Sequence, residues 1–359
     1  MKKILVLVAD YPDNNGKVTL MYVHTRNLAY IKNNIDVTVL NFNTLVNYEI
    51  EGVKVISLDY YKKNNNEYDI LVLHAVNLRN HYKFLNKYGD RFKRFVFFFH
   101  GHEVLKINKD YSKPYRYNKP NKIKDILQNC YDICKLYLWK KYFIKVVYKS
   151  DFIFVSKWMY DKFLLNTKIK EDFIKEKSHI TYNSVGYEFE RNIYDEKNKK
   201  EYDFVTIRAN FDNSKYAIDI VNRLACNTPN AKFLLIGKGE FFKYYKKASN
   251  IIWLDKNLSH NEIIDILQKC RFALMPTRTD AQGLMMCEMA AFGIPVITSD
   301  IPVCHEIFDD FDNVTYINNL DEKLNLNKYL NAKNVSLKDE RYFLKETILK
   351  ELSILNKDN

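Results

Sequence analysis

The chain has 359 residues and a hydrophobic content of 47%, enough to bury the cores of two domains of ordinary size. Its net charge of +12 favours anionic partners such as nucleotides or an acidic membrane surface, but no nucleic-acid-binding module accompanies that charge. The first apolar run stops at Asp10, too early for a signal peptide, and no stretch reaches the roughly 18 apolar residues of a membrane span, so we expect a cytoplasmic protein.

The first half of the chain has the strand and helix pattern of a parallel sheet. Apolar runs predict strands at 4–9, 35–40, 53–57, 70–74 and 95–99, and a helix over 18–32. The loop after the first strand has one glycine, Gly16, and lacks the G-x-G-x-x-G spacing of a dinucleotide site. His100 and His102 follow a strand directly, at the sheet edge where ligands gather. A polar loop whose histidines cap backbone groups is the simpler alternative.

Residues 106–150 form the most basic segment, with tyrosines and a tryptophan among the lysines. Residues 123–147 have helical periodicity, and the apolar positions 126, 127, 130, 133, 134, 136 and 137 share one side. A helix with basic and aromatic side chains can lie on an anionic bilayer, so we predict a membrane-surface contact through residues 113–149. An ordinary surface helix with solvated lysines is the alternative, and we expect no nucleic-acid partner.

A strand at 151–155 and a helix capped by Ser156 follow, and the polar stretch 186–201 predicts an interdomain linker. A second series of strands begins at 204–207. Arg208 ends that strand and Lys215 opens the next predicted helix, where a guanidinium and an ammonium can together hold a diphosphate. Two solvated surface cations are the alternative.

Further strands are predicted at 233–236, 251–254 and 272–275, and Gly237 lies in a glycine turn after the first of them. A loop over 277–282 leads into a helix over 283–293 and then a strand over 294–298. After residue 310 we predict a helical and polar chain, with an amphipathic helix over 337–355.

The start of the 283–293 helix carries the clearest chemistry. Its first backbone amides have no intrahelical partner, and with the helix dipole they form an anion site suited to phosphate. Asp280 in the loop and Glu288 in the helix can accept hydrogen bonds from hydroxyl groups beside that phosphate. A phosphate site between two hydroxyl-binding carboxylates describes a nucleotide sugar, whereas a capped helix with a stray acidic residue is the alternative. The amides belong to Gly283, Leu284 and Met285.

This region resembles the acidic-x7-Glu motif of the retaining family 4 glycosyltransferases. The match runs from Asp280 through Gly283-Leu284, Glu288 and Ala290-Ala291 to Gly293-Ile294-Pro295-Val296. Asp280 replaces the usual Glu, and Gln282 stands where an aromatic residue is common. Asn183-Ser184-Val185 also resembles the Asn-Gly-Val segment that closes the family's first domain, and Arg208 with Lys215-Tyr216 resembles its Arg and Lys-Gly diphosphate clamp.

The resemblance implies the GT-B architecture, an α/β fold of two Rossmann-like domains that face each other across a cleft. We expect an acceptor-binding domain over 1–186, a nucleotide-sugar-binding domain over 187–335, and a C-terminal helix over 336–359 that crosses back to the first domain. The implied activity is retaining transfer of a sugar from a nucleotide-diphosphate donor to a hydroxyl acceptor, such as a lipid-linked glycan. Surface polysaccharide or glycolipid assembly at the inner face of the membrane would be its setting, with no cofactor or metal ion.

The resemblance also implies roles for single residues. His100, with His102 as the fallback, would lie near the transferred sugar, Asp280 would orient the sugar, and Glu288 would orient the ribose. The donor would be bound by Arg208, Lys215, Gly237, Gly283, Leu284, Met285 and Glu288. A GT-B nucleotide-sugar epimerase and a non-catalytic scaffold apposed to the membrane are the alternative functions.

Overall fold

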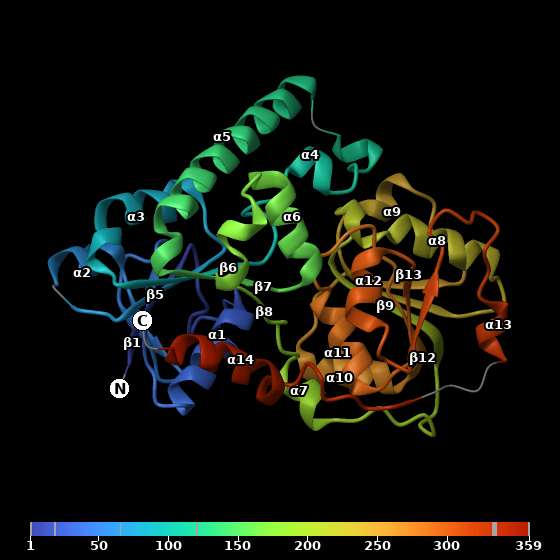
Figure 1. Cartoon of the computed structure of the whole chain (residues 1–359). Helices are drawn as coiled ribbons and strands as arrows, with labels where there is room; N and C mark the ends of the chain where they lie inside the picture. Colours follow the sequence, from blue (N-terminus) through green and yellow to red (C-terminus); the bar gives the residue numbers. More distant parts are fainter. Residues whose placement is uncertain (1, 18, 65, 120, 332–335, 358–359) are drawn as a thin grey trace. The chain divides into compact units, whose positions relative to one another are not determined.

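The computed structural model describes residues 2–17, 19–64, 66–119, 121–331 and 336–357 (Figure 1). The chain forms two compact units, each built on its own β-sheet. Unit 1 consists of Met1–Ile107, Asn129–Ser184 and Leu344–Asn359, and unit 2 consists of Asn108–Gln128 and Val185–Phe343. Position 335, where we predicted the end of the second domain, and position 18, the predicted start of a helix, lie outside the described residues.

The sheet of unit 1 has, within the described ranges, the strand order β3-β4-β2-β1-β5-β6-β7-β8. Its strands pair in parallel except β3, which is antiparallel to β4. The apolar runs of β1 and β6 are buried throughout their lengths apart from the first residue of β1, as expected when helices cover both faces of a sheet. The bounds are β1 Lys3–Val8, β2 Asp36–Asn41, β3 Tyr48–Ile50, β4 Val53–Ile56, β5 Ile70–His74, β6 Arg94–Phe99, β7 Ser150–Phe154 and β8 Ser178–Ile180.

The helices of the first half agree in type with the sequence pattern but differ at their ends. The predicted 18–32 helix begins at Met21, after Leu20 adopts a left-handed backbone with φ of 59°. Ser156 caps its helix as predicted, because its hydroxyl accepts the amide N–H of Met159. The bounds are α1 Met21–Lys32, α2 Leu58–Lys63, α3 Lys83–Tyr88, α4 Ile107–Asp110, α5 Lys122–Val146 and α6 Lys157–Thr167.

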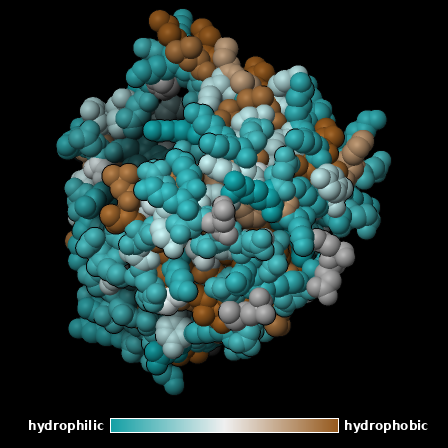
Figure 2. Space-filling model, turned by 90° about the vertical axis from the view of Figure 1, so that its left-hand side faces the viewer, coloured by the Kyte–Doolittle hydropathy of each residue, from teal (hydrophilic) through white to brown (hydrophobic). Residues whose placement is uncertain are grey.

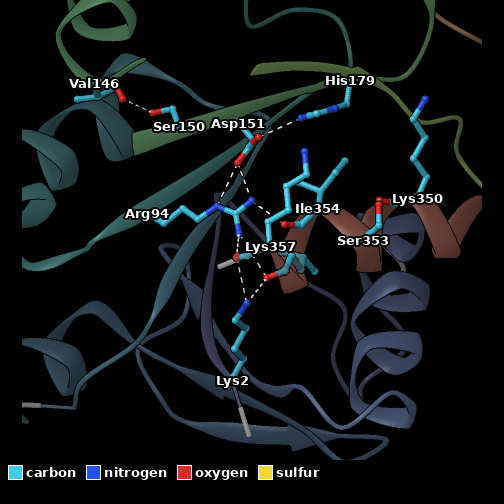
Figure 3. A network of polar contacts seen from close by, with 11 residues as sticks. Lys2, Arg94, Val146, Ser150, Asp151, His179, Lys350, Ser353, Ile354 and Lys357 are labelled. Atoms are coloured by element: carbon cyan, nitrogen blue, oxygen red, sulfur yellow. Dashed lines mark hydrogen bonds and ion pairs between the residues drawn. The ribbon is translucent and has the colours of Figure 1, made fainter. Parts of the chain in front are cut away.

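The last helix, α14 (Leu344–Asn356), belongs to unit 1 and starts seven residues later than the predicted 337. Arg94 pairs with Asp151 and also donates to the carbonyl oxygens of Ile354 and Lys357 (Figure 3). Lys2 donates to the carbonyl of Lys357 as well. Cations at the last carbonyl groups of a helix complement its dipole, so these contacts hold the end of α14 in unit 1.

The sheet of unit 2 has the order β11-β10-β9-β12-β13-β14 in the described part of the chain, with parallel pairing. Residues 314–317, which we predicted to lie in a helical region, instead form the edge strand β14, so that prediction is wrong. Val-Thr-Tyr-Ile is a β-branched and aromatic run too short to stand out in a polar region. The bounds are β9 Tyr202–Asn210, β10 Phe233–Lys238, β11 Ile251–Leu254, β12 Cys270–Leu274, β13 Val296–Ser299 and β14 Val314–Ile317.

The helices of unit 2 include one inside the predicted linker. Residues 187–191 of the 186–201 stretch form α7 rather than extended chain. Ser259 and Glu262 form the reciprocal capping box that starts α10, as their spacing indicates. The bounds are α7 Tyr187–Arg191, α8 Ile218–Asn227, α9 Phe241–Tyr244, α10 His260–Gln268, α11 Leu284–Phe292, α12 Pro302–Phe308 and α13 Asn327–Leu330.

The strand order of unit 2 reverses between β9 and β12, and that reversal marks the place where open α/β sheets bind ligands. The loops that leave the carboxyl ends of these two strands span 211–217 and 275–283. We call these two loops, with the strand ends they leave, the switch-point edge. Arg208, Lys215 and Asp280 all lie on it or beside it.

Candidate functional site

Arg208 lies near the end of β9 and is buried, with 4% of its surface exposed. Its Nη2 donates to the carbonyl oxygens of Met275 and Pro276, at 3.1 and 2.9 Å, where β12 leads into its loop. Burial lowers the pKa of Arg208, and the charge of Asp280 opposes that change. The Nε of Arg208 is buried without a hydrogen-bond partner. A buried cation with an unused donor therefore sits at the switch-point edge.

Lys215 shares an aromatic surface with Arg208. The Nζ of Lys215 lies 4.7 Å from the ring centroid of Tyr216, and the guanidinium carbon of Arg208 lies 5.0 Å from the same centroid. We predicted that a helix begins near Lys215, but Lys215 lies in a single 3-10 turn, Ser214–Tyr216, and α8 begins only at Ile218. Tyr216, which replaces the family's Gly, thus brings the two predicted diphosphate ligands together by cation–π contact.

The loop that carries Lys215 is braced by Arg278, a residue that the sequence reasoning missed. Arg278 forms a two-pronged ion pair with Asp219 of α8, at 2.9 and 2.5 Å, and donates to the carbonyl of Ser214. The amide of Arg278 also donates to the carbonyl of Lys215. The brace ties the two loops of the switch-point edge together, so it limits how far the Lys215 backbone can move.

Residues 108–118, which lie outside the predicted second domain of 187–335, also hold the loop after β9 in place. The hydroxyl of Tyr115 donates to Asp219, and that of Tyr117 donates to Asp212 in the loop after β9. Asp212 also accepts the amide of Glu240 from the turn after β10. Tyr115 is buried among the core residues of unit 2. Segment 108–128 therefore belongs with unit 2, which differs from the predicted 1–186 domain.

The amides predicted to bind phosphate are available in the structure. In the described part of the chain, the backbone N–H groups of Gly283, Leu284 and Met285 donate to no protein acceptor, while Gly283 carries φ of +76° as the N-cap of α11. The positive φ favours glycine at this position, whereas a Cβ there would require only the terminal methyl group of Met286 to move. The three amides and the dipole of α11 give the switch-point edge a fixed preference for anions.

Asp280 lies beside these amides. Its Oδ1 accepts the amide of Ala281 at 2.9 Å, and its Oδ2 lies 3.7 Å from the place that a Cβ of Gly283 would take. The carboxylate is partly exposed and close enough to Arg208 to affect its pKa. The structure thus brings Asp280, Arg208 and the start of α11 together.

Glu288 lies on a different side of α11 from the Arg208 contacts. Met286, which touches Arg208, and Glu288 are two residues apart and so point about 200° apart on the helix. Only 2% of Glu288 is exposed. Its Oε1 accepts the amide of Gly186 at 3.1 Å and lies 3.8 Å from Nε2 of His260, and burial raises the pKa of Glu288 to about 8. No contact in the described residues joins Glu288 to Arg208 or Asp280.

Gly237 has a structural reason to be glycine. A Cβ there would lie 1.8 Å from the carbonyl oxygen of Arg208, because β10 passes close to β9 at a break in their pairing register. Its carbonyl accepts the indole N–H of Trp253. Gly237 therefore supports the backbone of Arg208, and a ligand contact by Gly237 stays a prediction.

His100 lies in unit 1, directly after β6, and is held by polar contacts on both sides. The backbone amides of His100 and Gly101 donate to the carboxylate of buried Glu103, at 3.0 and 2.6 Å. Its ring Nε2 lies 3.0 Å from Nδ1 of His74, the last residue of β5. His102, the fallback, has an exposed side chain. In this loop the carboxylate of Glu103, and not a histidine ring, caps the free backbone amides. The ring of His100 therefore does not serve as a cap.

In the part of the chain that the structure describes, no group of three or more His, Cys, Asp and Glu side chains could hold a metal ion. The described cysteines are free thiols, exposed at 130, 134 and 226 and buried at 270, 287 and 304.

Residues 204–326 match the family model of the glycosyl transferases group 1. The match covers about a third of the chain and contains the whole switch-point edge as well as Glu288, whereas His100 lies outside it. The chain is also 29% identical over 149 residues to an uncharacterized glycosyltransferase of Methanocaldococcus jannaschii, covering 39% of each chain. It is 37% identical over 67 residues to the O-antigen biosynthesis glycosyltransferase WclY of Escherichia coli, covering 19% of this chain and 17% of WclY.

The fold is similar to solved glycosyltransferase structures over nearly the whole chain. A glycosyltransferase from Rickettsia africae aligns with a TM-score of 0.67 over 99% of both chains, at 14% sequence identity. The aligned regions span well under half the length of these curated relatives. The two α/β units have the GT-B fold of these solved structures. Residues 204–326 are similar to the glycosyl transferases group 1.

Proposed function

We propose that the protein is a retaining, metal-independent glycosyltransferase of family 4 that moves a sugar from a nucleoside-diphosphate donor to a hydroxyl acceptor. The observation that carries the proposal is the switch-point edge of unit 2, where Arg208 and Lys215 share the ring of Tyr216 next to free amides at the start of α11. A diphosphate is the anion that such paired cations and a helix start would hold together.

In the proposed reaction the bond between the anomeric carbon and the donor phosphate oxygen breaks, and a bond to the acceptor oxygen forms on the same face. The acceptor proton passes to the leaving phosphate. Arg208, Lys215 and the amides of 283–285 would stabilise the negative charge that develops on the diphosphate, which is the main electrostatic need of this step. These cations would do what a metal ion does in other transferases.

The carboxylates and the histidine would handle the sugar. Asp280, beside the amides, would accept a hydrogen bond from a hydroxyl of the transferred sugar. Glu288, next to half-exposed His260, would bind the ribose hydroxyls. His100 is the group of unit 1 that we propose for a hydrogen bond to a sugar hydroxyl. These three roles rest on residue chemistry and on the family's motif.

An acceptor in surface polysaccharide or glycolipid assembly is favoured by the similarity to WclY, whose name describes O-antigen biosynthesis. The basic first half of the chain agrees with an acceptor held at an anionic surface.

The test is an incubation of the full chain with UDP-, GDP- and ADP-sugars, with and without lipid-linked glycan acceptors, in the presence of a metal chelator. We expect release of the nucleoside diphosphate that depends on the acceptor, and a product whose anomeric configuration by NMR equals that of the donor. Conversion of the donor sugar without any acceptor would instead favour the epimerase. Donor binding with no turnover under any condition would favour the non-catalytic scaffold, and an inverted product would overturn retention.

We further propose that α5 lies on an anionic membrane. Its buried positions share one side, while the opposite side exposes Ile123, Ile126, Leu127, Ile133 and Tyr137, each more than half exposed. Figure 2 shows hydrophobic side chains at the top of the view, where Figure 1 has the N-terminal end of α5. No helix among the described residues is long and apolar enough to cross a bilayer, so this contact would be peripheral.

The lysines on α5 differ in their availability for lipid headgroups. Lys141 and Lys145 are exposed on the apolar side, whereas Lys149 donates to the carbonyls of Gly89 and Phe92. Leu136, which we predicted on the apolar side, is buried on the other side of α5. Tyr115 and Tyr117, within the predicted 113–149 contact, instead bind unit 2.

Vesicle flotation tests the membrane contact. Replacing both Lys141 and Lys145 by Gln should reduce binding to vesicles rich in phosphatidylglycerol, and added salt should reduce the binding of the wild type. The matched control replaces Lys175 and Lys177, exposed lysines elsewhere in unit 1, and should bind as the wild type does. Equal binding to neutral vesicles, or equal loss in the control, would contradict the proposal.

A further inference from the structure

Buried His74 and partly buried His100 in unit 1 form a hydrogen-bonded pair that the proposed mechanism does not use. His74 ends β5 and His100 follows β6, so neighbouring parallel strands bring them together at their carboxyl ends. Nδ1 of His74 lies 3.0 Å from Nε2 of His100, with the rings nearly parallel at 23°. One hydrogen bond joins the two rings, so one nitrogen donates and the other accepts.

Both rings are neutral near neutral pH. Burial lowers the pKa of each histidine well below its usual value, and the charge of buried Arg26 acts in the same direction on both. Each neutral ring carries one proton, and only two arrangements satisfy the bond. Either His74 donates from Nδ1 and His100 keeps its proton on Nδ1, or His100 donates from Nε2 and His74 keeps its proton on Nε2.

The surroundings of Nε2 of His74, the ring nitrogen that faces away from His100, distinguish the two proton arrangements. Its Nε2 is buried and has no hydrogen-bond partner. In the second arrangement this nitrogen would be an orphaned N–H donor close enough to the Arg26 cation to feel its charge, and orphaned buried N–H groups are rare. In the first arrangement it is a bare lone pair, which the nearby cation stabilises. The geometry therefore favours His74 as the donor.

The position of the His100 ring is fixed by other residues. Glu103 holds the backbone amides of His100 and Gly101, and the ring of Tyr22 packs on the His100 ring at 4.7 Å between centroids. His74 itself stacks on Phe98 at 4.3 Å. These contacts orient the backbone and one face of the ring, so His74 is left to determine which ring nitrogen of His100 carries the proton.

We propose that His74 is a positioning residue that holds His100 in its Nδ1–H form, so that His100 offers a hydrogen-bond donor to a hydroxyl oxygen of the sugar substrate. Nδ1 of His100 makes no hydrogen bond within the described residues, and the side chain is only partly buried. The role of His100 toward a sugar rests on the proposed function, whereas the fixed proton position follows from unit 1 alone.

The spectroscopic test uses the full chain labelled with 15N-histidine. Two-bond 15N–1H spectra distinguish a protonated ring nitrogen from a bare one, and loss of signals in His100→Gln assigns the His100 ring. We expect His100 to carry its proton on Nδ1 between pH 6 and 8. His74→Phe, which keeps the ring stacking, should move His100 toward the Nε2–H form. A wild-type His100 with its proton on Nε2, or an unchanged His100 pattern in His74→Phe, would overturn the proposal.

Kinetics supply the functional readout. His74→Phe should lower kcat at least tenfold with little change in the KM of the nucleotide sugar. His74→Asn should stay within about threefold of the wild type, because the amide nitrogen of Asn can occupy the place of the imidazole Nδ1 and donate the same bond. Equal losses in both variants, with unfolding temperatures like the wild type, would contradict the donor role. If the wild type transfers no sugar while the NMR pattern is as expected, the proposed function fails and the proton assignment stands.

Discussion

At the scale of single residues, the raised pKa of Glu288 follows from its burial between α11, Gly186 and His260. A carboxylate that orients ribose hydroxyls works best as an acceptor-only anion, yet burial makes ionisation costly in the free protein. Bound hydroxyl groups would supply hydrogen bonds that lower this cost. If Glu288 binds the ribose as proposed, binding of the nucleotide sugar should offset the free-energy cost of ionising this buried carboxylate.

Replacing Glu288 by Gln should stabilise the free protein above neutral pH. The pKa of Glu288 rises from 4.5 to about 8 on folding. Between these values the unfolded chain has lost a proton that the native state keeps, so native stability falls as pH rises. The gain of the Gln variant should be near zero at pH 4.5 and reach about 4 kcal/mol at pH 8. Urea unfolding at both values measures it.

A stability difference between Glu288→Gln and the wild type that does not change with pH would contradict this account. The same variant should bind nucleotide sugars more weakly, because a Gln amide cannot accept two hydroxyl groups as a carboxylate does.

Several site residues could be predicted from the sequence because their signals are local. The glycine that follows the polar loop correctly predicted that the helix begins at Gly283, its N-cap, although the left-handed backbone of this residue was not predicted. The burial of Glu288 could not be predicted, because it depends on Gly186, 102 positions away in sequence. Arg278 was missed for a similar reason, since its partner Asp219 lies on another element.

At the scale of elements, the loop that carries Lys215 has no helix of its own to hold it. It consists of one 3-10 turn closed by Ala217 with φ of 54°. The ion pair of Arg278 with Asp219 and the hydrogen bond from Tyr115 to Asp219 hold this loop where a helical turn would otherwise do so. The position of Lys215 thus depends on side chains from separate elements.

Replacing Arg278 by Gln should raise the KM for the nucleotide sugar about tenfold and change kcat less. The variant removes the ion pair with Asp219 and the bond to the carbonyl of Ser214, so the Lys215 loop becomes mobile. Arg271→Gln is the matched control, because Arg271 also pairs with an aspartate, Asp203, but at the opposite end of β12. Equal kinetics for the two variants would show that the brace does not position the donor.

The terminal helix α14 depends on a buried ion pair. Glu351 accepts hydrogen bonds from Arg26 at 2.9 Å and from the hydroxyl of Tyr30 at 2.6 Å, and only 1% of it is exposed. Glu351→Ala should destabilise unit 1 by about 3–5 kcal/mol, because the change leaves the Arg26 charge buried without its partner. The urea midpoint of unfolding measures the loss.

Glu346→Ala, an exposed glutamate in the first turn of α14, should leave that midpoint nearly unchanged. A similar loss in both variants would contradict the role of the buried pair, because Ala has a higher helix propensity than Glu and only Glu351 pairs with Arg26.

Periodicity predicted α5 and its apolar side, because a 25-residue helix carries a strong signal. The short strands β3, β8 and β14 were not predicted, because each mixes polar or exposed residues with its apolar ones, whereas equally short strands such as β11 have an apolar run.

At the scale of the whole molecule, the alternation of strands and helices was enough to predict two α/β domains. It could not reveal that residues 108–128 belong to unit 2, because that assignment rests on side-chain contacts such as Tyr117 with Asp212. The chain therefore passes from one unit to the other after Ile107, Gln128, Ser184 and Phe343. The residues that we propose to bind the donor, by contrast, come from one continuous region of unit 2 that matches the family model.

The most direct measurement is a calorimetric titration of the full chain with UDP, GDP and ADP. The account predicts that one of them binds the wild type, that Lys215→Ala weakens this binding at least tenfold, and that Lys269→Ala does not. Lys269 is a matched control because it is exposed and precedes β12, at the opposite end of that strand from the switch-point edge. Binding of none of the three nucleotides, or unchanged binding in Lys215→Ala, would contradict the account.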